Sequence, residues 1–211
     1  MPETNPRRPS FGESFARVGP RMDARGAADH RRRLVEAAYG AVIEIGAGYG
    51  ATFPFYPAAV TGVLALEPDP TLRKLAQAAV TRAQAPVTVH DGVAEELPAA
   101  DASVDVVVSS LVLCSVADQP VALAEVVRVL RPGGLLLFYE HVRSAHRMLG
   151  AAEDLLTPLW SRMAGGCHPN RNTAAAIASA GLTVQALERF GFSVLPGNPR
   201  LAHVLGTASK P

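Results

Sequence analysis

The sequence contains very little lysine and very little cysteine. Lys74 and Lys210 are the only lysines among 211 residues, so arginine carries nearly all the positive charge. Cys114 and Cys167 are the only cysteines, too few for the disulfide framework of a small secreted protein, and they fit free thiols in a reducing compartment. The charge is balanced at +1, from 20 basic and 19 acidic residues. This balance argues against nucleic acid as a partner, because phosphate binding needs an extended basic surface.

Long apolar runs are also missing. No stretch approaches the roughly 20 unbroken apolar residues of a membrane span. Residues 1–10 hold prolines and arginines with no apolar segment behind them, so we expect no signal peptide. With 48% hydrophobic residues, a chain of this length can form a single core. We expect a cytoplasmic protein with a flexible tail at 1–10 and one domain at 11–211.

Short apolar runs alternate with amphipathic segments from Ala41 onward. The pattern predicts an α/β fold: a Rossmann-like, mostly parallel sheet with helices on both faces. Seven strands are expected, at about 41–45, 62–67, 86–90, 104–109, 134–140, 182–188 and 202–207. Helices are expected between them at 50–57, 70–84, 117–130 and 171–180, and in an N-terminal helical cap, 11–38, that breaks at Gly19-Pro20. Arg131 to Gly134 is expected to end a helix.

A glycine-rich turn follows the first expected strand. Gly46, Gly48 and Gly50 stand where such a sheet brings bare backbone against a ligand, and a side chain there would hold the ligand away. Gly46, Gly48 and Ala51 also satisfy the dinucleotide fingerprint G-x-G-x-x-G/A. The turn alone therefore does not choose between cofactors, and a plain strand-to-helix turn is the structural alternative.

Three acidic features along the chain bear on that choice. Glu44 lies inside the first strand, where a buried carboxylate needs a cationic or donor group such as the ammonium of a methionine moiety. Glu67 ends the second strand, where it can accept from both ribose hydroxyls, which disfavours NADP. Asp91 to Pro98 follows the third strand and can wrap an adenine edge. Their order favours S-adenosylmethionine over NAD, although each acid alone also fits a structural role.

These motifs resemble those of the class I S-adenosylmethionine-dependent methyltransferases, specifically the type 11 group. The resemblance covers about residues 33–190 and rests on Glu44–Gly50, Leu66–Asp69, Asp91–Pro98, Asp105–Ser109 and Leu130–Gly134. It implies that the glycine turn borders the methionine part, that Glu67 takes the ribose, that Gly92 to Ala94 flank the adenine and that Ser109 lies near the sulfonium. The implied cofactor-binding residues are Glu44, Gly46, Ala47, Gly48, Gly50, Glu67, Pro68, Asp91, Gly92, Val93, Ala94 and Ser109.

Two further stretches resemble a narrower subfamily, which includes the membrane-associated thiol methyltransferases of animals. They are Ser110–Val116 and Gly165–Asn172. The animal proteins carry an apolar N-terminal anchor, and from residues 1–10 we expect none here. The resemblance to this subfamily implies an aromatic residue after Ala16-Arg17-Val18, and this sequence has Gly19 there.

Methyl transfer from a sulfonium depends chiefly on aligning the nucleophile, the methyl group and the sulfur. Such positioning can lower the activation barrier by roughly 7–11 kcal/mol. A base helps when the acceptor must lose a proton. His141, after the fifth strand, and His168, in the Gly-Gly-Cys-His segment, are the candidate bases; structural roles beside the pocket or in a loop are the alternatives. We expect no metal, because the spacing of Cys167, His168 and His141 matches no standard zinc pattern.

Residues 145–164 carry apolar side chains at helical intervals and form an insertion between strands. We interpret them as a lid over the acceptor. Together with the N-terminal helix they would enclose a mostly apolar chamber for a small molecule, lined by Phe11, Phe15, Cys114 and Trp160. An ordinary packing face or a dimer contact is the alternative, so monomer and homodimer both remain open.

Three other functions compete with methyl transfer to a small molecule. A short NAD-dependent oxidoreductase would need Tyr-x-x-x-Lys, which neither Lys74 nor Lys210 can complete. A non-catalytic binding or regulatory protein would keep the fold without the reaction. An RNA or DNA methyltransferase is disfavoured by the neutral charge and by the absence of an Asn/Asp-Pro-Pro-Tyr/Phe tetrad. The acceptor atom, whether sulfur, oxygen, nitrogen or carbon, stays open.

Overall fold

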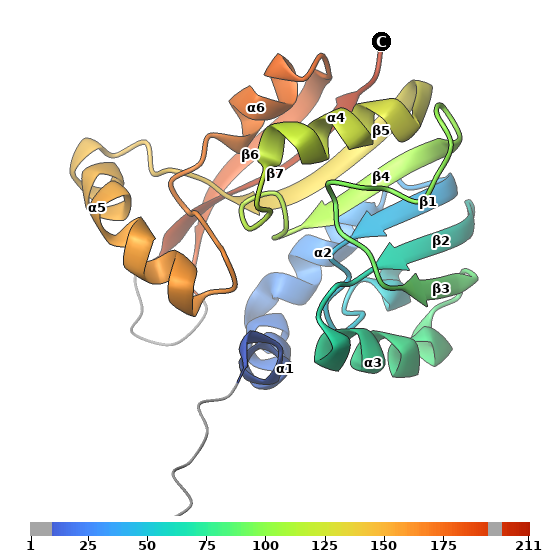
Figure 1. Ribbon diagram of the computed structural model, residues 1–211, viewed down its shortest axis with the longest axis horizontal. Coiled ribbons are helices and arrows are strands. Elements are labelled where there is room, and N and C mark those ends of the chain that lie inside the picture. The colour runs from blue at the N-terminus through green and yellow to red at the C-terminus, as the bar shows by residue number, and fades with distance from the viewer. Residues whose placement is uncertain (1–9, 194–199) are drawn as a thin grey trace, which may run out of the picture.

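The computed structural model describes residues 10–193 and 200–211. Its seven strands form one sheet in the order β3-β2-β1-β4-β5-β7-β6 (Figure 1). The pairs among β1 to β5 are parallel, and β7 runs antiparallel to both of its neighbours. The strands are β1 Gly40–Ile45, β2 Val60–Leu66, β3 Val87–His90, β4 Val104–Ser110, β5 Leu130–His141, β6 Thr183–Phe192 and β7 Leu201–Ser209. The expected fold class and all seven strands are confirmed, while the expected tail at 1–10 lies, except for Ser10, outside the described residues.

Helices cover both faces of the sheet, with α4 and α6 on one face and α2 and α3 on the other, while α5 stands away from the sheet (Figure 1). The longer helices are α1 Phe11–Met22, α2 Ala28–Val35, α3 Pro70–Ala79, α4 Gln119–Val129, α5 Arg147–Met163 and α6 Thr173–Ser179. Short turns complete them: η1 Asp23–Ala27, η2 Phe53–Phe55 and η3 Val80–Arg82. A helix, α5, thus forms in the segment 145–164 that was expected to act as a lid; the covering role stays a prediction, and we use lid only as a name for this helix.

Strand residues alternate between two apolar cores. Val107 of β4 packs with the α4 and α6 side, whereas Val106 and Val108 pack with the α2 and α3 side. Successive strand side chains point to opposite faces, so a strand buried on both faces reads as a continuous apolar run. This is why the central strands could be found in the sequence.

Side-chain caps fix where several helices begin. The Asp69 carboxylate accepts from the backbone N–H groups of Thr71 and Leu72, and Pro70 occupies the first turn of α3. Asp118 caps α4 in the same way. Such caps satisfy helix N–H groups that have no partner within the helix. Because Asp69 follows β2 by only three residues, its cap holds the chain close to the sheet edge.

The expected break at Gly19-Pro20 is wrong. Helix α1 continues through Pro20, and the chain then widens into the π-helical turn η1 before α2 begins. The change of direction comes at Gly26, whose φ of 118° is open mainly to glycine. Tight packing holds Gly19 in the helix, because a Cβ there would overlap the ring of Tyr49.

The prediction of a helix at 50–57 is also wrong. Only the single 3₁₀ turn η2 forms there. Pro54 and Pro57 remove two backbone donors, and the buried rings of Phe53 and Tyr56 fasten the segment to the core instead. At Arg131–Gly134 the expected helix end is wrong: the helix has already ended at Val129, and these four residues lie in β5, which begins at Leu130.

Candidate functional site

The glycine turn between β1 and η2 holds three residues with left-handed backbone. Gly46, Gly48 and Gly50 have φ values of 58°, 58° and 74°. A Cβ at Gly46 would lie 2.5 Å from Val112, so packing alone requires glycine there. At Gly48 the nearest atom to such a Cβ is in the ring of Phe15, at 3.6 Å. That separation is an ordinary van der Waals contact, so at Gly48 it is the left-handed backbone, and not close packing, that favours glycine.

Glu67 ties this turn to the end of β2. Its carboxylate accepts from the N–H of Gly48 at 2.7 Å and from the N–H of Asp69 at 2.9 Å. The side chain is buried, and burial raises its pKa despite these two N–H donors. The structure thus brings together two residues that the sequence placed in one site, and each carboxylate oxygen keeps a lone pair for a further donor.

Arg73 of α3 organises the neighbouring edge, and sequence reasoning missed it. One nitrogen of its guanidinium donates to the carbonyls of Glu67 and Pro68, and it also pairs with Asp91 at 2.9 Å. Asp91 itself is exposed, and Val93 nearby is 44% exposed. The only available signal was the position of Arg73 one helical turn after the Asp69 cap.

Glu44 is enclosed in the core beneath the turn, with 1% of its surface exposed. The hydroxyl of Tyr56 donates to its carboxylate at 2.8 Å. Burial raises the pKa of Glu44 to about 7, and the hydrogen bond from Tyr56 opposes that rise. Glu44 is therefore poised between its neutral and charged forms near neutral pH. The Tyr56 donor was not anticipated, because nothing in the sequence links it to Glu44.

Glu140, at the end of β5, anchors the segment that follows β4. Its buried carboxylate accepts from the Ser109 hydroxyl at 2.5 Å and from the N–H groups of Val112, Leu113 and Cys114 at 3.0–3.1 Å. Four donors satisfy a carboxylate that would otherwise be costly to bury. Ser109, expected near the sulfonium, is thus held by Glu140.

Two cysteines and a histidine meet beside this anchor. The sulfurs of Cys114 and Cys167 are 3.7 Å apart, and His141 Nδ1 lies 3.7 Å from the first and 3.4 Å from the second. All three residues are buried. The pKa of Cys167 is lowered, chiefly by its hydrogen bond with Cys114 and then by His141, while the pKa of Cys114 is raised. The lid residue Trp160 reaches the same thiol of Cys167.

The other ring nitrogens near this cluster are unsatisfied. Nε2 of His141 and Nε2 of His203 are buried without a hydrogen-bond partner, and the two ring centres lie 4.3 Å apart. Burial lowers the pKa of His203 to about 3. Nδ1 of His168 is likewise unpaired, but the backbone N–H of His168 donates to the Cys114 carbonyl at 2.7 Å. His168 therefore anchors its loop, while Asn172 caps α6.

Helix α1 lies over the glycine turn. Phe15 faces Gly48 and its ring centre is 5.8 Å from that of Tyr49. The Tyr49 hydroxyl donates to Asp23 at 2.5 Å, and Asp23 pairs with the buried Arg31. The N-terminal cap is therefore bonded to the turn that it covers, a contact between elements that sequence reasoning placed in separate sites.

The lid helix α5 presents most of its large apolar side chains outward. Leu155 is 81% exposed, whereas Trp160, nearer the cysteine cluster, is 42% exposed. Phe11 of α1 contacts the end of the lid, since a Cβ at Gly165 would lie 2.6 Å from its ring. The structure thus places Phe11, Phe15 and Trp160 on the two helices expected to cover the acceptor.

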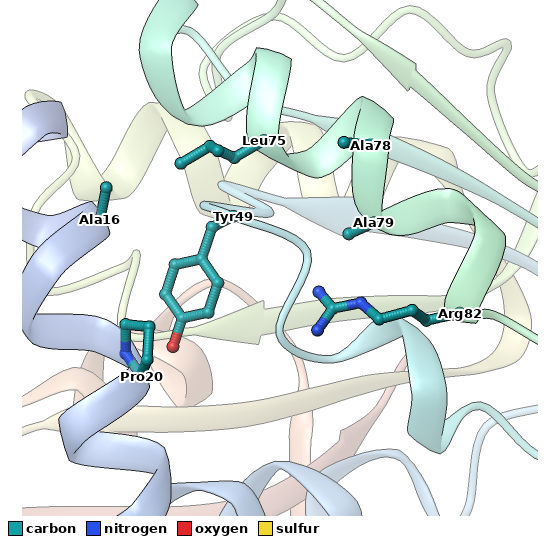
Figure 2. A pocket seen from close by; sticks show the side chains of 7 residues that line it. All are labelled: Ala16, Pro20, Tyr49, Leu75, Ala78, Ala79 and Arg82. Carbon is teal, nitrogen blue, oxygen red and sulfur yellow. The ribbon is translucent and has the colours of Figure 1, made fainter.

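Figure 2 shows a groove between α1 and α3, with the ring of Tyr49 in its lining. Its lining is mainly apolar, with one guanidinium: Ala16, Pro20, Tyr49, Leu75, Ala78, Ala79 and Arg82. Neither Glu67 nor Asp91 contributes to it. The groove therefore meets the glycine turn at Tyr49 but does not reach the acidic residues expected to bind the ribose and the adenine.

The model of a methyltransferase domain family matches residues 43–138, which contain the glycine turn, Glu67 and Ser109. Thiol S-methyltransferase TMT1B of Rattus norvegicus is 36% identical over 177 residues, covering 80% of this chain and 70% of that protein. The human protein of the same name is 35% identical, covering 81% and 70%. The chain belongs to the S-adenosylmethionine-dependent methyltransferases. The enzyme class and the cofactor that the motifs indicated are thereby confirmed, and the oxidoreductase and binding-protein alternatives are set aside.

Solved methyltransferases share the fold. An S-adenosylmethionine-dependent methyltransferase of Thermotoga maritima superposes with a TM-score of 0.71 at 21% identity, covering 95% of this chain and 98% of that one. At that identity the likeness supports the fold alone. In the described part of this methyltransferase, no helix has the length and apolar character needed to cross a membrane.

Proposed function

We propose that this methyltransferase transfers the methyl group of S-adenosylmethionine to the sulfur of a small, hydrophobic thiol. The observation that carries the proposal is the extent of the match to thiol S-methyltransferases. It covers 80% of the chain, whereas the methyltransferase domain model ends at residue 138. The likeness therefore reaches well beyond the cofactor-binding half, toward the lid and the cysteine-containing segments.

The cofactor fits the edge formed by β1, β2 and β3. We assign the methionine ammonium to Glu44, the methionine backbone to Gly46–Gly50 and the ribose hydroxyls to Glu67. Gly92 to Ala94 flank the adenine, and Ser109 lies toward the sulfonium. The left-handed backbone of Gly48 and the donors already gathered by Glu67 support this arrangement.

The reaction needs alignment more than acid–base chemistry. A thiolate attacks the methyl carbon in line, the carbon–sulfur bond of the sulfonium breaks, and the products are a methyl thioether and neutral S-adenosylhomocysteine. A thiol of ordinary pKa, about 8.5, is already ionised to a few per cent at neutral pH. The acceptor proton can therefore leave before attack without a strong base. His141 and His168 remain candidates for easing that loss.

The acceptor is proposed to lie between α1 and the lid. Phe11, Phe15 and Trp160 supply apolar surface from those two helices, and we assign the buried Cys114, in the segment after β4, to the floor. An apolar chamber with few polar groups suits a small hydrophobic molecule.

We further propose that the enzyme works in the cytoplasm, as a monomer or homodimer, on small molecules and not on nucleic acid. The net charge of +1 and two cysteines unpaired by any disulfide are consistent with this setting.

Matched acceptors test the proposal directly. The chain would be incubated with methyl-labelled S-adenosylmethionine and an alkyl thiol, the alcohol of the same chain length, or the corresponding amine. We expect label in the thioether alone, with transfer rising as the alkyl chain lengthens. Preferred labelling of the alcohol or amine, or of none of the three, would contradict the choice of acceptor atom.

A further inference from the structure

We propose that Cys114, His141 and Cys167 form a metal site for a thiophilic, tetrahedral cation, with Zn²⁺ as the expected occupant. The three residues come from the segment after β4, the end of β5 and the loop after α5. They are separated by 26 to 53 positions in the sequence. No local motif therefore reveals the site, which is why the sequence led us to expect none.

The distances between the donor atoms carry the proposal. Zinc binds sulfur at about 2.3 Å and imidazole nitrogen at about 2.0–2.1 Å, so a tetrahedral site has edges of about 3.8 Å between sulfurs and about 3.6 Å from sulfur to nitrogen. The observed edges are 3.7 Å for the sulfur pair and 3.7 Å and 3.4 Å for the two sulfur–nitrogen pairs. Each agrees with the ideal edge to about 0.2 Å. Trigonal coordination would require longer edges.

The donor set selects the class of cation. Two thiolates and an imidazole suit zinc, whereas magnesium and calcium require oxygen ligands. Two thiolates also neutralise a divalent cation within a buried site, with a neutral histidine as third ligand. Three protein ligands leave the fourth corner of the tetrahedron for a ligand from outside the chain.

The surroundings hold the ligands in place. The backbone N–H of Cys114 is fixed by Glu140, and its carbonyl accepts from the N–H of His168, next to Cys167. His141 stands in the ladder between β5 and β7, opposite His203. The side chains thus project from backbone that is already hydrogen-bonded. A metal bound there would join the loop after the lid to the edge of the sheet.

An internal disulfide is the competing use of the two thiols. It requires the sulfurs to approach to about 2.05 Å. At 3.7 Å they stand apart, and His141 Nδ1 faces both. A disulfide leaves that nitrogen without a role, whereas a metal uses all three atoms.

Metal content gives the test, on the tag-free, full-length chain kept reduced and grown with added zinc. We expect about one zinc per chain by elemental mass spectrometry. Cys114→Ala and Cys167→Ala should each lower that content at least about tenfold, whereas His146→Ala, at an exposed histidine before the lid, should leave it unchanged. Zinc that persists in the double cysteine variant would overturn the proposal.

Cobalt provides a readout that does not depend on the folding of a variant. Metal-free wild-type chain titrated with Co²⁺ should develop a thiolate-to-cobalt charge-transfer band, and prior alkylation of both thiols should remove it. Absence of the band together with absence of zinc, or a Cys114–Cys167 disulfide in the freshly purified chain, would overturn the assignment. Neither measurement uses a methyl acceptor, so failure here leaves the proposed methyl transfer standing.

Discussion

The two ends of the site satisfy their buried polar groups in different ways. Around β1 and β2, Glu67 accepts two backbone N–H groups and Glu44 accepts the Tyr56 hydroxyl. Around β4, β5 and β7, the structure leaves buried polar atoms without partners. They are Ser110 Oγ, His141 Nε2, His168 Nδ1 and His203 Nε2, and they make up all such side-chain atoms found among the described residues.

Unpaired buried groups are costly, and natural structures keep few of them without a reason. Their concentration at one end indicates where partners from outside the chain belong. The end around β1 and β2 is prepared before a ligand arrives, because Glu67 already holds the glycine turn in position and Glu44 has its own donor in Tyr56. The other end keeps unpaired buried atoms, which agrees with a site that receives an acceptor; none of these four atoms is a ligand of the proposed metal, which would bind His141 through Nδ1.

The largest expected effect is a loss of folding stability on substitution of Glu140, which lies between the two ends of the site. Glu140→Ala removes the acceptor of four buried donors, so we expect the free energy of unfolding to fall by about 3 kcal/mol or more. Urea denaturation measures it. Glu188→Ala, at a half-exposed ion pair with Arg33, is the control and should cost less than about 1 kcal/mol. Equal losses in the two variants would remove the special role of Glu140.

The next effect concerns the cofactor end alone. Gly48→Ala adds a Cβ facing the space assigned to the methionine part, and we expect affinity for S-adenosylmethionine to fall at least about tenfold in calorimetric titration. Gly133→Ala is the matched control, because Gly133 has a φ of 77° and no atom within 4 Å of the added Cβ. Alanine at position 133 should bear a similar left-handed backbone strain to alanine at position 48, but away from the glycine turn. If both variants bind like the wild type, the cofactor does not approach Gly48.

The pH dependence of cofactor affinity should distinguish Glu44 from Glu67, which holds the glycine turn. The raised pKa of Glu44, about 7, means that the free protein carries a partly protonated carboxyl at neutral pH. Because the ligand ammonium favours the charged form, affinity relative to the Glu44→Gln variant should rise about tenfold from pH 6 to pH 8. Taking the ratio cancels titration of the ligand itself. A flat ratio would separate Glu44 from the ammonium.

The raised pKa of Glu44 has the opposite effect on folding stability, which should fall with rising pH while cofactor affinity rises. A carboxyl whose pKa is higher in the folded state stabilises the protein below its unfolded pKa, near 4.5, and that contribution is lost as the pH rises toward 7. The wild type should therefore lose stability relative to Glu44→Gln across this window, by urea denaturation at several pH values. A relative gain would show that the folded state prefers the charged form.

The smallest effect concerns the acceptor end. Trp160→Ala should raise KM for a hydrophobic thiol severalfold, through loss of about 1 kcal/mol of apolar contact, and leave cofactor affinity unchanged. Met148→Ala, at the opposite end of the lid and 78% exposed, is the control and should change neither quantity. Steady-state kinetics at saturating cofactor measure both. Parallel changes in the two variants would argue that α5 acts only as a surface helix.

The cofactor end could be read from the sequence because its parts are local. Each strand is a short apolar run, and the residues predicted to bind the cofactor lie in or directly after β1 to β4, so alternation and chain order were sufficient to predict this end. The break at Gly19-Pro20 failed for the opposite reason, since packing of Gly19 against Tyr49 overrode the local signal. Cys114 and Cys167 meet across 53 positions, and no sequence periodicity reports such a contact.

The most direct test of thiol methylation offers both acceptor atoms in one molecule. The enzyme would receive methyl-labelled S-adenosylmethionine and a hydrophobic mercapto-alcohol, and magnetic resonance would identify the atom that carries the new methyl group. Sulfur is the stronger nucleophile at neutral pH because part of the thiol is already ionised, while the alcohol is not. We predict the methyl thioether as the only product. A methyl ether, or label on neither atom, would contradict the account.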